Sequence, residues 1–130
     1  MRLKVSLPTE VLVDADVEKV IAEGPEGQFC LLPRHVDYAA LVVPGVLLYV
    51  PAGAGGAERY LGVDEGVLVK RGADVLVSLR DAVAGDDLAE LRRIVDRRFR
   101  QLDEHERQAR SALARLEAGV MRRFTELEER

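Results

Sequence analysis

The 130-residue sequence has one cysteine, no tryptophan and no excess of positive charge. The single cysteine, Cys30, excludes an internal disulfide and a zinc site made only of cysteines. The net charge of −4 argues against a general nucleic-acid-binding protein, which needs a basic surface to neutralise phosphates. No apolar run approaches the roughly 20 residues of a membrane span, and the N-terminus turns acidic too soon for a signal peptide. We therefore expect a cytoplasmic protein that binds no nucleic acid and does not insert into a membrane.

Turn-forming residues nearly disappear after residue 85. All five prolines, ten of the eleven glycines and sixteen of the eighteen valines lie in residues 1–85, whereas residues 86–130 have no lysine but eleven arginines. Valine favours strands, and glycine and proline favour turns. The sequence therefore predicts an α+β protein with segregated parts: an antiparallel β-sandwich over residues 1–84 and a helical region over residues 86–130.

Eight short apolar runs bounded by turn residues predict the strands of the sandwich. They cover residues 2–7, 10–14, 17–22, 29–32, 45–50, 59–63, 66–70 and 74–79. Apolar and polar residues alternate most clearly in the first and last of these runs. Because parallel strands need crossovers of a dozen residues or more, the tight connections between these runs predict antiparallel pairing.

An amphipathic helical pattern follows Gly85. Asp86 and Asp87 suit a helix N-terminus, where an Asp side chain caps backbone N–H groups. Apolar residues then recur at helical spacing: Leu88, Leu91, Val95, Phe99 and Leu102, and again Ala109, Leu113, Leu116, Val120, Phe124 and Leu127. The pattern lapses over residues 103–106, where no Gly or Pro enforces a break. A helical hairpin and one continuous helix of about 65 Å both remain open.

Cys30, His35 and Asp37 are close in sequence and suggest a nucleophile–base pair or a metal site. The only other histidine is His105, and the spacing of Cys30 and His35 lacks the i,i+4 geometry of a helix. A free cysteine at the centre of a strand is more often a small buried hydrophobic residue. We therefore expect no metal, and a small enzyme based on Cys30 and His35 is the weaker hypothesis, which a thiol-reactivity assay tests.

Five arginines gather in the first half of the helical region: Arg92, Arg93, Arg97, Arg98 and Arg100. A charge run on a helix is usually a solvated face with i,i+4 ion pairs, and Asp96 with Arg100 fits such a pair. The exclusive use of arginine has a second interpretation, because its planar fork binds carboxylates and phosphates through two hydrogen bonds. A solvated face, contact with an acidic partner and phosphate binding remain open.

The order of these features resembles the epsilon subunit of F-type ATP synthases. The family's segments "EGxxGxxPxH" and Pro-Gly, its late strands and its junction into the helices correspond to residues 26–35, 44–45, 60–69, 75–80 and 81–88. Cys30 and Arg34 depart from the pattern, because the family usually has Gly at both positions. Residues 31–37 and 112–119 resemble the divergent epsilon subunit of the alternate, sodium-type ATPase operon.

The resemblance implies a non-catalytic rotor subunit without a cofactor, in a complex that couples ATP synthesis to proton or sodium transport. Such subunits join the gamma subunit to the c-ring at the cytoplasmic face of the membrane. Their ring-facing acid and histidine correspond to Gln28 and His35, so the acid is lost here. The helical tail, which would contain the five arginines, can extend to the alpha/beta catalytic head and inhibit ATP hydrolysis.

Some bacterial members bind ATP through an (Ile/Leu)-Asp-x-x-Arg-Ala pattern, to which residues 88–93 correspond. Arg92 is kept, but Ala89 replaces the Asp and Arg93 replaces the Ala. Because losing one buried hydrogen-bond partner costs about 1–3 kcal/mol, we expect ATP to bind no more tightly than millimolar. Isothermal titration calorimetry measures this affinity, and micromolar binding would show that the expectation is wrong.

The alternative is a free-standing binding module that dimerises through its helical tail. The residues from Leu88 to Leu102 with helical spacing would then form an intermolecular seam. Co-purification separates the two hypotheses, because a rotor subunit binds gamma and the c-ring whereas this module forms a homodimer alone.

Overall fold

The computed structural model describes residues 1–100, which form one compact unit. The second half of the helical pattern, and with it the choice between a hairpin and one long helix, lies outside the described residues. The strands are β1 Arg2–Ser6, β2 Val11–Gly24, β3 Gly27–Leu31, β4 Tyr38–Val42, β5 Gly45–Pro51, β6 Arg59–Val63, β7 Gly66–Arg71, β8 Asp74–Leu79 and β9 Ala82–Gly85. A short α-helix, α1 Leu88–Ile94, continues into a π-helical stretch, η1 Val95–Arg100.

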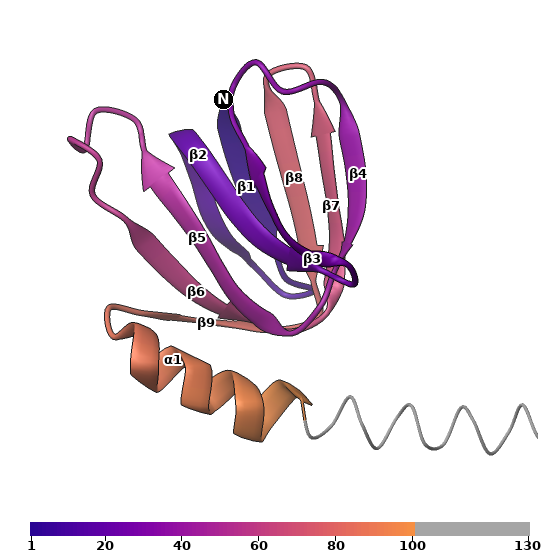
Figure 1. Ribbon diagram of the computed structural model, residues 1–130, viewed down its shortest axis with the longest axis vertical. Helices are drawn as coiled ribbons and strands as arrows, with labels where there is room; N and C mark the ends of the chain where they lie inside the picture. Colours follow the sequence, from indigo (N-terminus) through magenta and orange to yellow (C-terminus); the bar gives the residue numbers. More distant parts are fainter. Residues whose placement is uncertain (101–130) are drawn as a thin grey trace, which may run out of the picture. The chain divides into compact units, whose positions relative to one another are not determined.

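The strands form two packed layers that share the long strand β2 (Figure 1). One layer has the order β4-β7-β8-β1-β2, and in the other β2 continues through β5 and β6 to β9, with β3 paired beside β2. Alternate side chains of each layer enter the core between them, among them Leu3, Val5, Leu47, Leu68 and Val77. The predicted β-sandwich is therefore confirmed.

Two of the predicted runs, 10–14 and 17–22, are parts of the single strand β2. β4 and β9 were not predicted, since β4 points Leu41 outward and β9 consists of small residues. The expectation of antiparallel pairing throughout is wrong for β1 and β8, which pair in parallel with Leu3 opposite Val75. The intervening strands β2–β7 supply the crossover that a parallel pair requires.

The helix begins where the sequence predicts it. The side chain of Asp87 accepts hydrogen bonds from the backbone N–H groups of Ala89 and Glu90, at 3.0 and 3.3 Å. α1 then lies against β6 and β9 (Figure 1). In the described part of the chain, no helix is long and apolar enough to cross a membrane.

The apolar face of the helix packs on the chain's own sandwich. Leu91, Val95 and Phe99 are almost completely buried. The dimerisation alternative is therefore wrong for these three residues, because none of them is available for an intermolecular seam. The predicted boundary between the sandwich, residues 1–84, and the helical region, residues 86–130, stays a prediction. The compact unit of the described residues extends to Arg100.

Candidate functional site

An apolar surface lies on the outer side of the layer that contains β4, β7 and β8. Leu41, Val67 and Leu76 are 60%, 45% and 49% exposed, and we call these three residues the outer apolar face. They lie on the same side of the layer. Leu41 pairs with Val67, and Leu76 pairs with Val69, which points to the same side as Val67 because the two are two residues apart on β7. Neighbouring large apolar side chains left in solvent mark a surface suited to a protein partner.

Gln28 and His35 lie at opposite ends of β3. Gln28 is exposed beside the hairpin that joins β2 to β3, whereas His35 follows the other end of β3 and is half-buried. The His35 ring hydrogen-bonds to the carbonyl of Val36 at 2.7 Å and contacts the ring of Tyr38 with centroids 5.5 Å apart. The structure thus does not bring the two predicted ring-facing residues together, and only His35 belongs to the loop of residues 32–37.

A buried lysine that the sequence analysis missed holds this loop. Lys70 on β7 is 1% exposed, and its Nζ donates to the carbonyls of His35 and Gly72, both at 2.7 Å. The backbone N–H of Gly72 in turn donates to Asp37 at 2.8 Å. The signal in the sequence was alternation, since Lys70 stands two residues after the core residue Leu68 on the same side of β7.

Replacing Lys70 by Met is expected to lower the free energy of unfolding by about 1–3 kcal/mol. The change keeps an unbranched apolar stem but leaves the carbonyls of His35 and Gly72 without their charged donor. Thermal unfolding followed by circular dichroism measures the effect. Lys4→Met is the matched control, because Lys4 is exposed on β1. Equal melting temperatures for the two variants would show that Lys70 does not hold the loop.

Cys30 is exposed on β3, so the expectation that it is a buried hydrophobic residue is wrong. It pairs with Ile21 across the hairpin, while the His35 ring turns to Val36 and Tyr38. No hydrogen bond joins Cys30 to His35 in the described residues. The geometry therefore gives no support to a nucleophile–base pair.

The five arginines of the helix do not form one surface. Arg98 forms an ion pair with Asp81 at 3.3 Å, and Arg100 contacts Glu23 at 3.8 Å. Arg100 also contacts Asp96, which confirms the predicted i,i+4 pair. The remaining three, Arg92, Arg93 and Arg97, are exposed and have no ion pair within residues 1–100. Two arginines thus form ion pairs that hold the helix on the sandwich. The other three form none among the described residues, and one of them, Arg92, lines the pocket between the helix and the sandwich.

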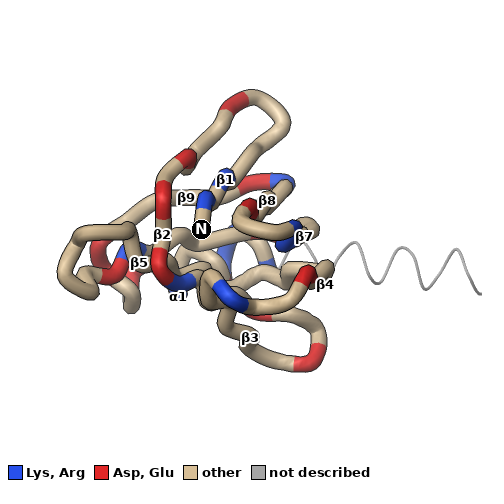
Figure 2. The backbone as a smooth tube through the Cα atoms, turned by 90° about the horizontal axis from the view of Figure 1, so that it is seen from above, with Lys and Arg blue, Asp and Glu red and all other residues tan. Residues whose placement is uncertain are grey.

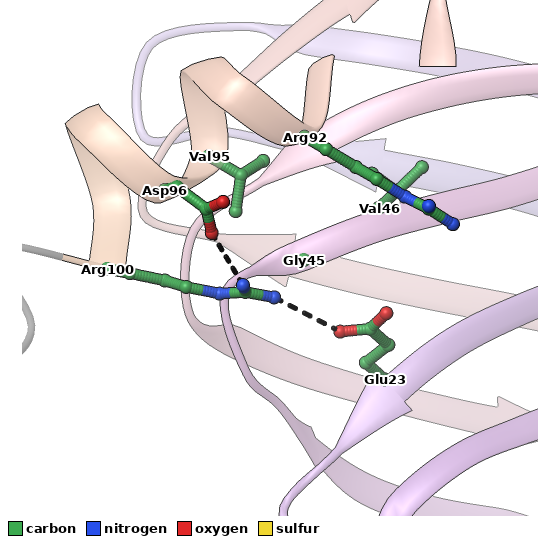
Figure 3. A pocket seen from close by; sticks show the side chains of 7 residues that line it. All are labelled: Glu23, Gly45, Val46, Arg92, Val95, Asp96 and Arg100. Atoms are coloured by element: carbon green, nitrogen blue, oxygen red, sulfur yellow. Dashed lines mark hydrogen bonds and ion pairs between the residues drawn. The ribbon is translucent and has the colours of Figure 1, made fainter. Parts of the chain in front are cut away.

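A pocket of about 180 Å³ lies between the helix and the second layer (Figure 3). Its charged lining consists of Glu23, Asp96, Arg92 and Arg100, and Gly45, Val46 and Val95 complete it. Two carboxylates oppose two guanidinium groups, so the pocket lacks the excess of positive charge that favours a phosphate. The expectation of weak ATP binding stays a prediction.

Other charges are paired on the surface of β1 and β2. Acidic residues recur along β2 (red in Figure 2), and Arg2 on β1 contacts two of them, Asp14 at 2.8 Å and Asp16 at 3.7 Å. The hydrogen bond to Asp14, more than any other contact, raises the pKa of Arg2 above its usual value. Arginine is charged at neutral pH in either case, so this group is a surface ion pair and not a titrating site.

Residues 1–85 match the protein family described as the β-sandwich domain of the ATP synthase delta/epsilon chain. The ATP synthase epsilon chain 2 of Paraburkholderia xenovorans is 36% identical over 127 residues, which cover 95% of this chain and 89% of that relative. The ATP synthase epsilon chain 2 of Cereibacter sphaeroides is 34% identical over 124 residues, with 94% and 84% covered. The name "chain 2" agrees with the predicted alternate type.

Two solved structures of mitochondrial ATP synthases contain chains with a similar fold. The match in the OSCP/F1/c-ring structure from Euglena gracilis has a TM-score of 0.58 at 18% identity, and covers 68% of this chain and 56% of that chain. The match in the central stalk/c-ring structure from Tetrahymena thermophila has a TM-score of 0.54 at 11% identity, with 65% and 66% covered. These two matches show the fold, and the sequence matches show the family. The chain belongs to the ATP synthase epsilon family, whose members are non-catalytic subunits of the ATP synthase complex.

Proposed function

We propose that this chain sits on the rotor at the cytoplasmic face of the membrane and couples the catalytic head to the c-ring through the gamma subunit. The outer apolar face carries the proposal, because Leu41, Val67 and Leu76 together form an exposed apolar surface of the kind that partner proteins cover. Gamma is the partner that membership of the epsilon family implies for this surface.

The loop of residues 32–37 is the proposed contact with the c-ring. Lys70 and Asp37 fix its backbone to the β7–β8 turn, so that the loop is presented as a rigid element. Gln28 carries no charge, and Leu32 and Val36 are exposed apolar residues of the loop. The contact therefore relies on His35 and apolar side chains and not on a carboxylate of β3.

The helical region is the proposed regulator of ATP hydrolysis. Arg92, Arg93 and Arg97 are exposed and form no ion pair with the sandwich, so their guanidinium groups are available to bind carboxylates of the alpha/beta head. In this proposal the helix leaves its place against β6 and β9 to reach the head.

The proposed coupling is tested by ATP-driven ion transport. The remaining subunits of the complex are reconstituted in vesicles with and without this chain, and hydrolysis and ion uptake are measured together. We expect the complex without the chain to hydrolyse ATP with little ion uptake, and addition of the chain to restore uptake. Full uptake without the chain would contradict the proposal.

A further inference from the structure

Arg100 is tied to two separate segments of the sandwich. We infer that Glu23, Gly45 and Arg100 form a latch, which holds the end of η1 on the sandwich and sets how often the helical region is released. The inference deepens the regulatory part of the proposed function and rests on it for the consequence in the assembled enzyme. The latch itself is a property of the isolated chain.

The sandwich provides a fitted seat for the helix. A Cβ atom at Gly62 would lie 3.1 Å from Val95, and one at Gly85 would lie 3.0 Å from Leu91. Both distances are shorter than ordinary contacts, so the two missing side chains leave the space that the helix occupies. The buried face of the helix therefore packs closely against the sandwich at Gly62 and Gly85.

The latch closes this seat at the C-terminal end of the described helix (Figure 3). Arg100 approaches the carboxylate of Glu23 on β2 at 3.8 Å and donates to the carbonyl of Pro44, before β5, at 3.4 Å. Asp96, on the same helical stretch, contacts the same guanidinium group and keeps it directed at the sandwich. One side chain thus joins η1 to β2 and to the turn between β4 and β5.

Gly45 makes the position of Glu23 possible. Gly45 does not have a positive φ angle, so the backbone conformation does not require glycine at this position. A Cβ atom at Gly45 would instead overlap the Glu23 carboxylate, whose Cδ would lie 2.8 Å away. The missing side chain leaves the room through which Glu23 reaches Arg100.

The latch biases the helix and does not lock it. The side chains of Arg100 and Glu23 are 53% and 29% exposed, and ion pairs in such surroundings shift an equilibrium by about fivefold or less. A carboxylate on a partner protein can therefore compete with Glu23 for Arg100. The helix would then leave the sandwich when an acidic surface comes within reach.

Amide hydrogen exchange of the full-length chain tests the latch, read at residues 88–100. We expect Glu23→Gln and Arg100→Gln each to speed exchange there by about two- to fivefold. The double variant should exchange no faster than the faster single variant, because both changes remove one contact. Arg93→Gln is the matched control and should exchange like the natural chain, because Arg93 is exposed without an ion pair to the sandwich.

Gly45→Ala provides a second, independent route to the same contact. It should speed amide hydrogen exchange of residues 88–100 as Glu23→Gln does. In a chain that already carries Glu23→Gln, it should not speed this exchange any further. Effects of Glu23→Gln and Arg100→Gln that multiply in the double variant, or no change with either, would overturn the latch. Because the isolated chain is measured, this failure is distinct from a failure of ion coupling, which would instead overturn the proposed function.

Discussion

A chain carrying Leu41→Asp and Leu76→Asp is expected to fold normally but to lose at least about 100-fold in affinity for the gamma subunit. Both side chains are about half exposed or more, so the change leaves the core intact. In a complex, however, each carboxylate would be buried without a partner, and central interface residues often contribute about 2 kcal/mol or more. Titration of purified gamma with the variant and the natural chain measures the difference.

Ala54→Asp is the control for added charge, since Ala54 is exposed on the hairpin between β5 and β6, away from the outer apolar face. Circular dichroism and the melting temperature establish that both variants are folded. If Leu41→Asp with Leu76→Asp binds gamma as tightly as the control does, the outer apolar face is not the binding surface.

Substitutions in the two groups of arginines are expected to change ATP hydrolysis in opposite directions. Replacing Arg92, Arg93 and Arg97 by Ala should raise hydrolysis by the assembled enzyme, because these side chains are available to the catalytic head. Replacing Arg98 and Arg100 by Ala should lower it, because these side chains hold the helix on the sandwich through Asp81 and Glu23. If all five arginines acted as one regulatory set, both replacements would change ATP hydrolysis in the same direction.

The size of each effect follows from the strength of exposed ion pairs. Each contributes about 0–1 kcal/mol, so three together contribute up to about 3 kcal/mol and can change hydrolysis by up to about 100-fold. Ala is a strong helix former, so the helix persists in both variants. Hydrolysis is measured at low and high salt, and the differences should shrink at high salt because screening weakens ion pairs. Equal rates for the natural complex and both variants would leave the arginines without a regulatory role.

Local patterns were enough to predict most of the sandwich and the start of the helix. β6 and β8 were predicted with their observed bounds, because flanking turn residues define both strands and alternation also marks β8. β4 was missed because its outward-facing apolar residues hide the alternation. The parallel pairing of β1 with β8 could not be predicted from adjacent turns, because the two strands lie far apart in the sequence although they are neighbours in the sheet.

The residues that position the candidate sites depend on contacts between distant parts of the chain. Glu23 lies just after the predicted run 17–22, and its contact with Arg100 appears only when the two distant segments are placed side by side. Gly45 was predicted only as the start of a strand and as part of the Pro-Gly motif, and the space that its missing side chain leaves for Glu23 is visible only in the structure. His35 was found through the family resemblance, whereas Lys70 could have been found from alternation along β7.

The central claim, that this chain is a rotor subunit, is tested most directly by native mass spectrometry of the full-length chain mixed with gamma and the c-ring. The account predicts a complex that contains one copy of this chain for each gamma subunit, bound to the ring. A chain that stays apart from both partners, alone or as a homodimer, would contradict it.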